Sequence, residues 1–352
     1  MPDGSARLRG RPIGAHAPTS GGLASGSLRY AAAVGAEAIQ VFVANPRSWA
    51  LTRRDAAQQA AQEEALREAA AEARMPVFVH APYLVNVASP DPRLRALSAG
   101  SIRHSLARGA AIGARGVVVH TGSATDGNRD GGLARARECL LPILAGIGAD
   151  APDLLLEPMA GQGNALCSLV ADLGPYLDAL SWHPRAGICL DTCHLFAAGH
   201  DLAGPAGPAI VLAELDALAA GRLRLVHAND SRDCCGSTRD RHAAIGQGQI
   251  GTAAFASLLS HPATDGAAFV VETPGGAAGQ AADIAALREL RETANLAGPR
   301  PRRGRGRPAG QGGGRPAGQG GGRPAGQGGG RPAGQGGGRP AGQGGGPSPG
   351  CS

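Results

Sequence analysis

The chain has 352 residues, 43% of them hydrophobic and 3% aromatic, with a formal net charge of +6, and it is long enough to bury the core of one large domain. Its longest apolar runs are shorter than the ~20 residues that span a bilayer, and its Cys residues form no CxxC pair, which excludes a membrane span and argues against a disulfide framework. Because the N-terminus also lacks a basic segment followed by an apolar one, we expect a reduced, cytoplasmic protein with no membrane partner.

After residues 1–11, which we expect to be unstructured, short apolar runs alternate with Ala-, Leu-, Arg- and Glu-rich segments. Eight runs are expected to be strands, because uninterrupted β-branched runs are typical of strands buried on both faces: residues 12–16, 38–43, 76–82, 116–122, 153–159, 186–194, 223–230 and 267–274. The intervening segments have helical spacing, as in residues 55–74, 93–113 and 131–148. Eight alternations within residues 12–297 predict an α/β fold, the (β/α)8 or TIM barrel.

Polar residues follow seven of these apolar runs at or just beyond their carboxyl ends. They are His16, His80, His120, Glu157, Asp191, His227 and Glu272. A single His or Glu in such a place is most often an ordinary loop residue. In a barrel, however, all carboxyl ends of the strands open on one face, so the seven side chains are expected to converge there.

Nine residues are candidates for holding metal ions. They are His80, His120, Glu157, Asp191, His194, His227, Asp240, His242 and Glu272. His and carboxylate groups suit divalent ions such as Zn²⁺, Mn²⁺ or Fe²⁺, and nine exceed what one ion coordinates. They are enough for two or three ions if a carboxylate bridges. A polynuclear site suits the hydrolysis of phosphate esters, because cations stabilise both the attacking and the leaving oxygen.

The last segment, residues 298–352, repeats the octapeptide RPAGQGGG five times from Arg307 onward. So much Gly and Pro with so little side chain to bury predicts a disordered Gly/Arg/Pro-rich tail. The tail has nine Arg and no acidic residue, so removing it from the net charge of +6 leaves −3 for residues 1–297. The pI of about 9.3 therefore indicates a nucleic-acid partner only through the tail, unless metal ions restore positive charge to the body.

Seven motifs resemble those of the endonuclease IV family of zinc-dependent apurinic/apyrimidinic (AP) endonucleases, and they occur in the family's order. The motifs are GAHAPTSGGL (14–23), HAPYLVN (80–86), EPMAGQG (157–163), CLDTCHLFAAGHD (189–201), HANDS (227–231), DRHAAIGQGQIG (240–251) and VETP (271–274). Two departures, Thr121 where the family usually has Pro and Pro158–Met159 where it usually has Asn-Thr, remove no ligand.

The resemblance implies three zinc ions per chain, for which Mn²⁺ is an alternative. The implied ligand sets are His80, His120 and Glu157 for one ion, Glu157, Asp191, His227 and Glu272 for a second, and His194, Asp240 and His242 for a third. It also implies that double-stranded DNA is cut on the 5′ side of an abasic site, leaving a 3′-hydroxyl. A metal-bound hydroxide would be the nucleophile, Glu157 would bridge two ions, and Glu272 would help to hold the nucleophile.

The family also bends DNA and fills the space of the missing base with loop side chains, and the matching positions are Arg47, Tyr83 and Leu84. Two other functions stay open from the residues alone: a metal-dependent sugar isomerase or epimerase on a similar barrel, and a non-catalytic, metal-stabilised DNA-binding protein. The isomerase needs only one or two ions, so Asp240 and His242 would be surplus to it. We expect a monomer, which suits a loop-lined DNA groove.

Overall fold

The computed structural model describes residues 10–49 and 55–296, so the predicted tail and residues 1–9 lie outside the described part of the chain. Eight parallel strands close a barrel in the order β1-β10-β7-β6-β5-β4-β3-β2. The barrel strands are β1 (Ile13–His16), β2 (Ile39–Val41), β3 (Val77–His80), β4 (Gly116–His120), β5 (Asp153–Glu157), β6 (Ala186–Asp191), β7 (Leu223–His227) and β10 (Ala268–Val271). Each lies within one of the eight predicted runs, which confirms the predicted TIM barrel.

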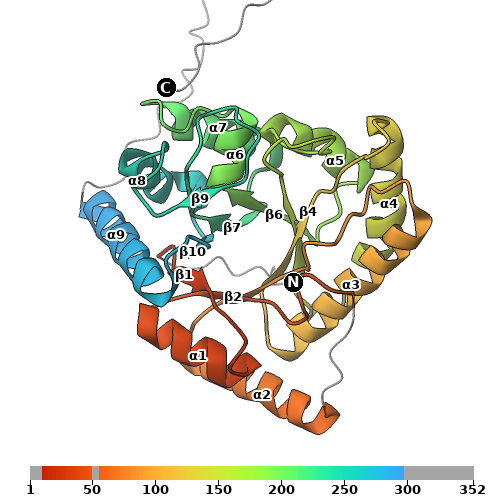
Figure 1. Cartoon of the computed structure of the whole chain (residues 1–352), viewed down its shortest axis with the longest axis horizontal. Helices are drawn as coiled ribbons and strands as arrows, with labels where there is room; N and C mark the ends of the chain where they lie inside the picture. The colour runs from red at the N-terminus through yellow and green to blue at the C-terminus, as the bar shows by residue number, and fades with distance from the viewer. Residues whose placement is uncertain (1–9, 50–54, 297–352) are drawn as a thin grey trace, which may run out of the picture. The chain divides into compact units, whose positions relative to one another are not determined.

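Helices surround the strands in Figure 1. The described residues form α1 (Leu23–Val34), α2 (Ala56–Glu72), α3 (Pro92–Ala111), α4 (Arg129–Ala145), α5 (Leu173–Ala179), α6 (Thr192–Ala198), α7 (Gly207–Ala219), α8 (Thr252–Ser260) and α9 (Gly276–Leu296), with short 3-10 turns at Val170–Asp172 and Pro262–Thr264. The side chains of Asp55, Asp91 and Asn128 accept backbone N–H groups at the starts of α2, α3 and α4, which explains where these helices begin. None of the helices in the described residues is long and apolar enough to cross a bilayer.

The interior of the barrel has an apolar floor, a separate buried cluster inside the ring of strands. Its members are Ala38, Phe78, Val118, Leu155, Cys189, Leu225, Ala268 and Val270. Since side chains alternate between the two faces of a strand, the residue two positions further along points into the barrel as well. Beyond the floor, the last inward residue at the carboxyl end of each strand is polar, so a polar layer covers the floor.

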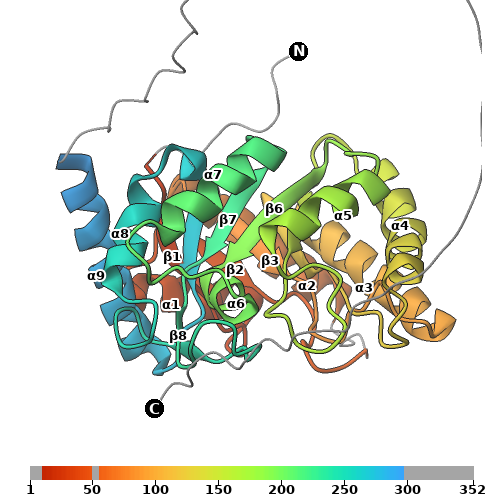
Figure 2. The same ribbon diagram turned by 90° about the horizontal axis from the view of Figure 1, so that it is seen from above.

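A short hairpin lies beside this polar layer, formed by β8 (Asp230–Ser231) and the antiparallel β9 (His242–Ala243). In Figure 2, β8 lies with α6 at one end of the barrel, and the two elements are in contact. The buried carboxylate of Asp230 accepts backbone N–H groups from Gly246, Gly248, Ile250 and Gly251. At Gly248 a Cβ would lie 2.4 Å from the Asp230 Oδ1 atom, so this loop needs a glycine there.

Candidate metal centre

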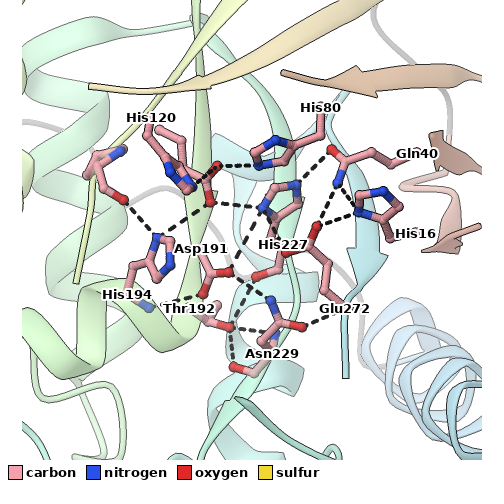
Figure 3. Close-up of polar contacts among 12 residues, drawn as sticks. His16, Gln40, His80, His120, Asp191, Thr192, His194, His227, Asn229 and Glu272 are labelled. Carbon is pink, nitrogen blue, oxygen red and sulfur yellow. Dashed lines mark hydrogen bonds and ion pairs between the residues drawn. The ribbon is translucent and has the colours of Figure 1, made fainter. Parts of the chain in front are cut away.

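The nine side chains predicted to bind metal converge at the carboxyl ends of the barrel strands, as Figure 3 shows for those that it labels. Potential ligand atoms lie within 4.8 Å of one another in five groups of the described residues. Two of the groups include a thiol: Glu157 with Cys189 and His227, and Cys193 with Asp240 and His242. The three without a thiol are His80 with His120 and Glu157, Asp191 with His227 and Glu272, and Asp191 with His194 and His242. Asp240 joins the last group through its ion pairs with both imidazoles, His194 and His242. The structure therefore brings all nine together.

Glu157, the last residue of β5, lies in the middle of this cluster and is buried. Its Oε2 atom is 3.4 Å from His80 Nε2 and 3.5 Å from His120 Nε2. Its Oε1 atom is 2.9 Å from His227 Nδ1 and 3.5 Å from His194 Nδ1. Burial alone would raise the pKa of Glu157, but the surrounding imidazoles outweigh it and hold that pKa well below its usual value.

His227, the last residue of β7, faces three carboxylates with a single nitrogen. Its Nδ1 atom is 2.9 Å from Glu157, 3.5 Å from Glu272 and 3.9 Å from Asp191. Burial opposes a charge on this imidazole, yet the neighbouring acidic groups raise its pKa well above the usual value. So dense a set of carboxylates requires positive charge, whether from protons or from cations.

Asp191 ends β6 and caps α6, because its Oδ1 atom accepts the backbone N–H of His194 at 3.0 Å. The cap places His194 so that its Nε2 atom lies 3.3 Å from Asp240, while His242 Nε2 lies 3.0 Å from the same carboxylate. Burial opposes the charged imidazoles, but Asp191 and Asp240 raise the pKa of His194 to about 10 and that of His242 to about 9. The side chain of Asp240 is 40% exposed, so this end of the cluster opens to solvent.

Two residues of the cluster were not predicted from the sequence, Gln40 and Asn229. Gln40 in β2 donates from Nε2 to Glu272 Oε1 at 2.7 Å, and its Oε1 atom lies 2.9 Å from His227 Nε2. The side chain of Asn229 donates to Asp191 Oδ2 at 2.7 Å and accepts the backbone N–H of Glu272 at 2.8 Å. In the sequence, Gln40 could have been recognised as a site residue because it is a lone amide inside an apolar run. Nothing marked Asn229 as a site residue except its place in the motif HANDS.

The three residues predicted to contact DNA lie on two loops beside the cluster. Arg47 is exposed, and the side chains of Tyr83 and Leu84 are 49% and 39% exposed. The Tyr83 ring centroid is 5.5 Å from that of His80, and its backbone N–H donates to the Pro46 carbonyl at 3.1 Å, so the two loops are in contact. Partial burial, together with nearby carboxylates, raises the pKa of Tyr83 to about 12, so the ring stays a neutral phenol.

The cluster fits a divalent transition metal by its donor set, which combines five imidazoles with four carboxylates. The Glu157 Oε2 atom is buried without a hydrogen bond, and the buried His242 Nε2 atom lies beside two carboxylates, those of Asp240 at 3.0 Å and Asp191 at 3.6 Å. Bound cations would satisfy both atoms. The nearby Cys189 and Cys193 are buried, and burial raises the pKa of both thiols, that of Cys189 to about 12.

Comparison with known proteins gives matches over most of the chain. The family described as "Xylose isomerase-like TIM barrel" matches residues 28–290. A protein named "Probable endonuclease 4" from Streptomyces coelicolor is 54% identical over 291 residues, which cover 82% of this chain and 98% of the relative.

Two solved structures place this chain among barrels of different chemistry. Endonuclease IV from Thermus thermophilus is 33% identical with a TM-score of 0.69, over 80% of this chain and 99% of that chain. A D-tagatose 3-epimerase-like protein is 20% identical with a TM-score of 0.61, over 81% and 99%, a likeness that shows the fold alone.

Proposed function

The chain belongs to the endonuclease IV family, and on that premise we propose that it is a zinc-dependent AP endonuclease. Its substrate is double-stranded DNA containing abasic sites, in which it hydrolyses the phosphodiester on the 5′ side of the lesion and leaves a 3′-hydroxyl. This activity belongs to base excision repair. The enzyme acts as a monomer.

The observation that carries this proposal is the convergence of nine His, Asp and Glu side chains at the carboxyl end of the barrel. Ordinary surface acids and imidazoles do not gather around one buried carboxylate whose Oε2 atom has two imidazoles beside it and no hydrogen bond. A single ion cannot use nine donors, whereas three ions with three or four ligands each can.

We assign His80, His120 and Glu157 to one zinc ion, and Glu157, Asp191, His227 and Glu272 to a second. The first set is one of the 4.8 Å groups, and so are Asp191, His227 and Glu272 of the second. Glu157 joins the second set through its 2.9 Å contact with His227. His194, Asp240 and His242 are assigned to a third ion, supported by the short distances from Asp240 to both imidazoles. Asp191 also lies near His194 and His242, so it borders the second and third sets.

When bound, the zinc ions supply Lewis acidity, which lowers the pKa of water at the site and offsets the charge of the phosphodiester. Glu157 holds the imidazoles of three strands and α6 around one carboxylate. Glu272 accepts hydrogen bonds on Oε1 from His16 and Gln40, so its Oε2 atom faces the other donors, where it would hold the second ion and help to orient the attacking water. The backbone of Glu272 is fixed by Asn229.

The exposed Tyr83 and Leu84 are proposed to enter the base stack at the abasic site, with Arg47 in the minor groove. An apolar wedge must protrude to act in this way, and the exposure of both side chains meets that requirement. The contact between the two loops holds Tyr83 beside His80, so the wedge stands at the edge of the metal cluster.

The decisive experiment uses a DNA duplex with one tetrahydrofuran abasic analogue and zinc-loaded protein. We expect a single nick on the 5′ side of the analogue with an end that a polymerase extends, and loss of the nick with a chelator or with Glu272→Gln. Metal analysis of the same preparation is expected to give about three zinc ions per chain. An intact duplex after incubation with zinc-loaded protein would overturn the proposal.

The two alternatives fit the observations less well. A sugar isomerase or epimerase shares the fold, as the epimerase-like structure shows, but Asp240 and His242 would be surplus to its one or two ions. A non-catalytic, metal-stabilised DNA-binding protein would also bind metal with these donors, but it would leave the abasic duplex uncut in the experiment above. Metal content separates the isomerase from the endonuclease, since of these two only the endonuclease needs about three ions.

A further inference from the structure

We propose that Gln40 is a positioning residue for the metal centre, because its amide fixes which nitrogen of His227 and which oxygen of Glu272 face the other donors. The inference rests on the proposed metal site. It concerns β2, a strand to which the ligand assignment gives no role.

Gln40 completes the polar layer of the barrel. Six of the other strands end in a residue of that layer, and Glu272 directly follows the seventh, β10: the residues are His16, His80, His120, Glu157, Asp191, His227 and Glu272. Gln40 pairs in register with His16 on one side and with the floor residue Phe78 on the other, so its side chain points into the barrel. It is completely buried, and a buried amide in an apolar strand is unfavourable unless its donors and acceptor are used.

The direction of the Gln40 amide follows from its neighbours. Glu272 Oε1, 2.7 Å from one end of the amide, belongs to a carboxylate that can only accept, so this end must be the NH2 group. The opposite end is therefore the carbonyl oxygen, and it faces His227 Nε2 at 2.9 Å. An oxygen there can only accept, so His227 carries a proton on Nε2.

The tautomer decides how His227 meets the carboxylates. Without a cation, Nδ1 donates to the Glu157 carboxylate at 2.9 Å, so both ring nitrogens carry protons. When a cation takes the place of the Nδ1 proton, the proton on Nε2 remains, and the lone pair of Nδ1 faces Glu157, Glu272 and Asp191. A cation among these three carboxylates can then bind to the Nδ1 atom of His227 without rotation of the imidazole ring. The opposite tautomer would direct an N–H group at the cation.

The same amide also orients Glu272. Its Oε1 atom accepts from Gln40 and from His16 Nδ1, at 2.7 and 2.8 Å, and is thereby saturated on the side away from the cluster. The Oε2 atom is left 3.5 Å from His227 Nδ1, on the side of the other carboxylates. One buried side chain thus aligns two proposed ligands of the same ion.

Partners of this kind change metal affinity by about 10- to 100-fold when they are removed. Gln40→Met keeps the length and apolar volume of the side chain and removes both polar ends. Gln40→Glu keeps an acceptor for His227 Nε2–H but cannot donate to Glu272. The matched control is Gln280→Met, because Gln280 is also buried and uses its amide between Tyr30 and the Thr273 carbonyl, touching none of the nine donors.

The test measures zinc affinity by competition with a chromophoric chelator, and the His227 tautomer by NMR of zinc-loaded protein labelled with ¹⁵N-histidine. The His227 signals are identified by their loss in His227→Asn. We expect wild type and Gln40→Glu to carry the His227 proton on Nε2, and Gln40→Met to lose about 10- to 100-fold in affinity for one zinc ion. Gln280→Met is expected to keep wild-type affinity at a similar melting temperature.

Unchanged zinc affinity in Gln40→Met, or a His227 proton on Nδ1 in the zinc-loaded wild type, overturns the inference. The wild-type NMR measurement decides it even if Gln40→Met does not fold. A wild type that binds no zinc overturns the proposed function and this inference with it. Zinc-loaded wild type that leaves abasic DNA intact counts against the proposed function alone.

Discussion

The Nδ1 atom of His227 lies 2.9 Å from the Oε1 atom of Glu157, so the last residue of β7 meets the last residue of β5 in front of the strand between them. This contact joins the two groups that are assigned to the first and second zinc ions. Glu157 is the only residue placed in both sets, which makes it the first target for mutation.

Glu157→Gln is expected to lower the zinc content by at least about one ion per chain and the rate of nicking by about 100-fold or more. The neutral amide keeps the size of the side chain and removes the charge that the four imidazoles share. Asp153→Asn is the control, because Asp153 begins the same strand and pairs with Arg185 and Arg224. A Glu157→Gln protein with full zinc content and full activity would contradict the bridging role.

Asp240→Asn is expected to remove about one zinc ion of three while the barrel stays folded, because this carboxylate lies at the exposed end of the cluster. Zinc content and the melting temperature are measured side by side. Asp233→Asn in the same hairpin connection is the control, since Asp233 pairs with Arg241 and Arg239 and with none of the imidazoles. Equal zinc loss in both variants would point to a general loosening of the hairpin.

Replacing Tyr83 and Leu84 together by Ala is expected to weaken binding of abasic duplex by about tenfold or more, because stacking of an aromatic side chain against a base contributes about 1–3 kcal/mol. Binding is measured by fluorescence anisotropy with a chelator present to prevent cleavage. The zinc content of the purified variant, measured before the chelator is added, should equal that of the wild type. Ile210→Ala on α7 is the control for removal of an exposed apolar side chain, and equal effects of the two changes would argue against a wedge.

Deleting residues 298–352 is expected to leave turnover at saturating substrate unchanged, and to weaken DNA binding with a flatter salt dependence. The tail has nine Arg, whose contacts with phosphates release counterions. Affinities at several salt concentrations, with and without the tail, measure the slope. A slope identical in both proteins would show that the tail does not bind DNA.

Glu37 is expected to stabilise the barrel at neutral pH and not in acid. It accepts from the Ile13 N–H and pairs with Arg288 and Arg291, so it ties the first strand to the last helix. Burial opposes its charge, but these partners outweigh burial and lower its pKa. Its contribution is therefore present above the unfolded pKa of about 4.3 and lost as the pH falls through the lower folded pKa.

Glu37→Gln should accordingly destabilise the protein by about 1–3 kcal/mol at pH 7, with a smaller difference at pH 3. Urea unfolding at both pH values measures this, and the control is Glu289→Gln on α9, the helix that carries Arg288 and Arg291. A difference that does not change between the two pH values would mean that the charge of Glu37 is not what stabilises the barrel.

The barrel was predictable because most of its strands are short apolar runs that end at a His, Asp or Glu. This pattern can be recognised in the sequence before any contact between strands is known. Gln40 escaped prediction because its run continues to Val43, whereas β2 ends at Val41. From the sequence it looked like an internal position, while in the barrel it is the last inward one. Asn229 lies in a loop, where periodicity says nothing about direction.

The ligand sets, too, depend on folding of the loops. Asp240 and His242 became candidates by residue type, but what brings them toward His194 is a hairpin whose following loop is gathered by Asp230. Asp240 and His242 reach His194 only after segments far apart along the chain have folded against one another, and no local sequence pattern predicts that contact.

The apolar floor and the polar layer inside the barrel are formed by different residues of the same strands. In β3, β4, β5, β6 and β7, one inward residue belongs to the apolar floor, and the inward residue two positions further on is a proposed metal ligand. Because these positions are separate, the polar side chains of the site can be replaced, one residue per strand, while the apolar floor that packs the strands together stays unchanged. The floor position and the ligand position are only two residues apart on a strand, yet each can be changed without the other. Barrels of the same fold can therefore catalyse unrelated reactions.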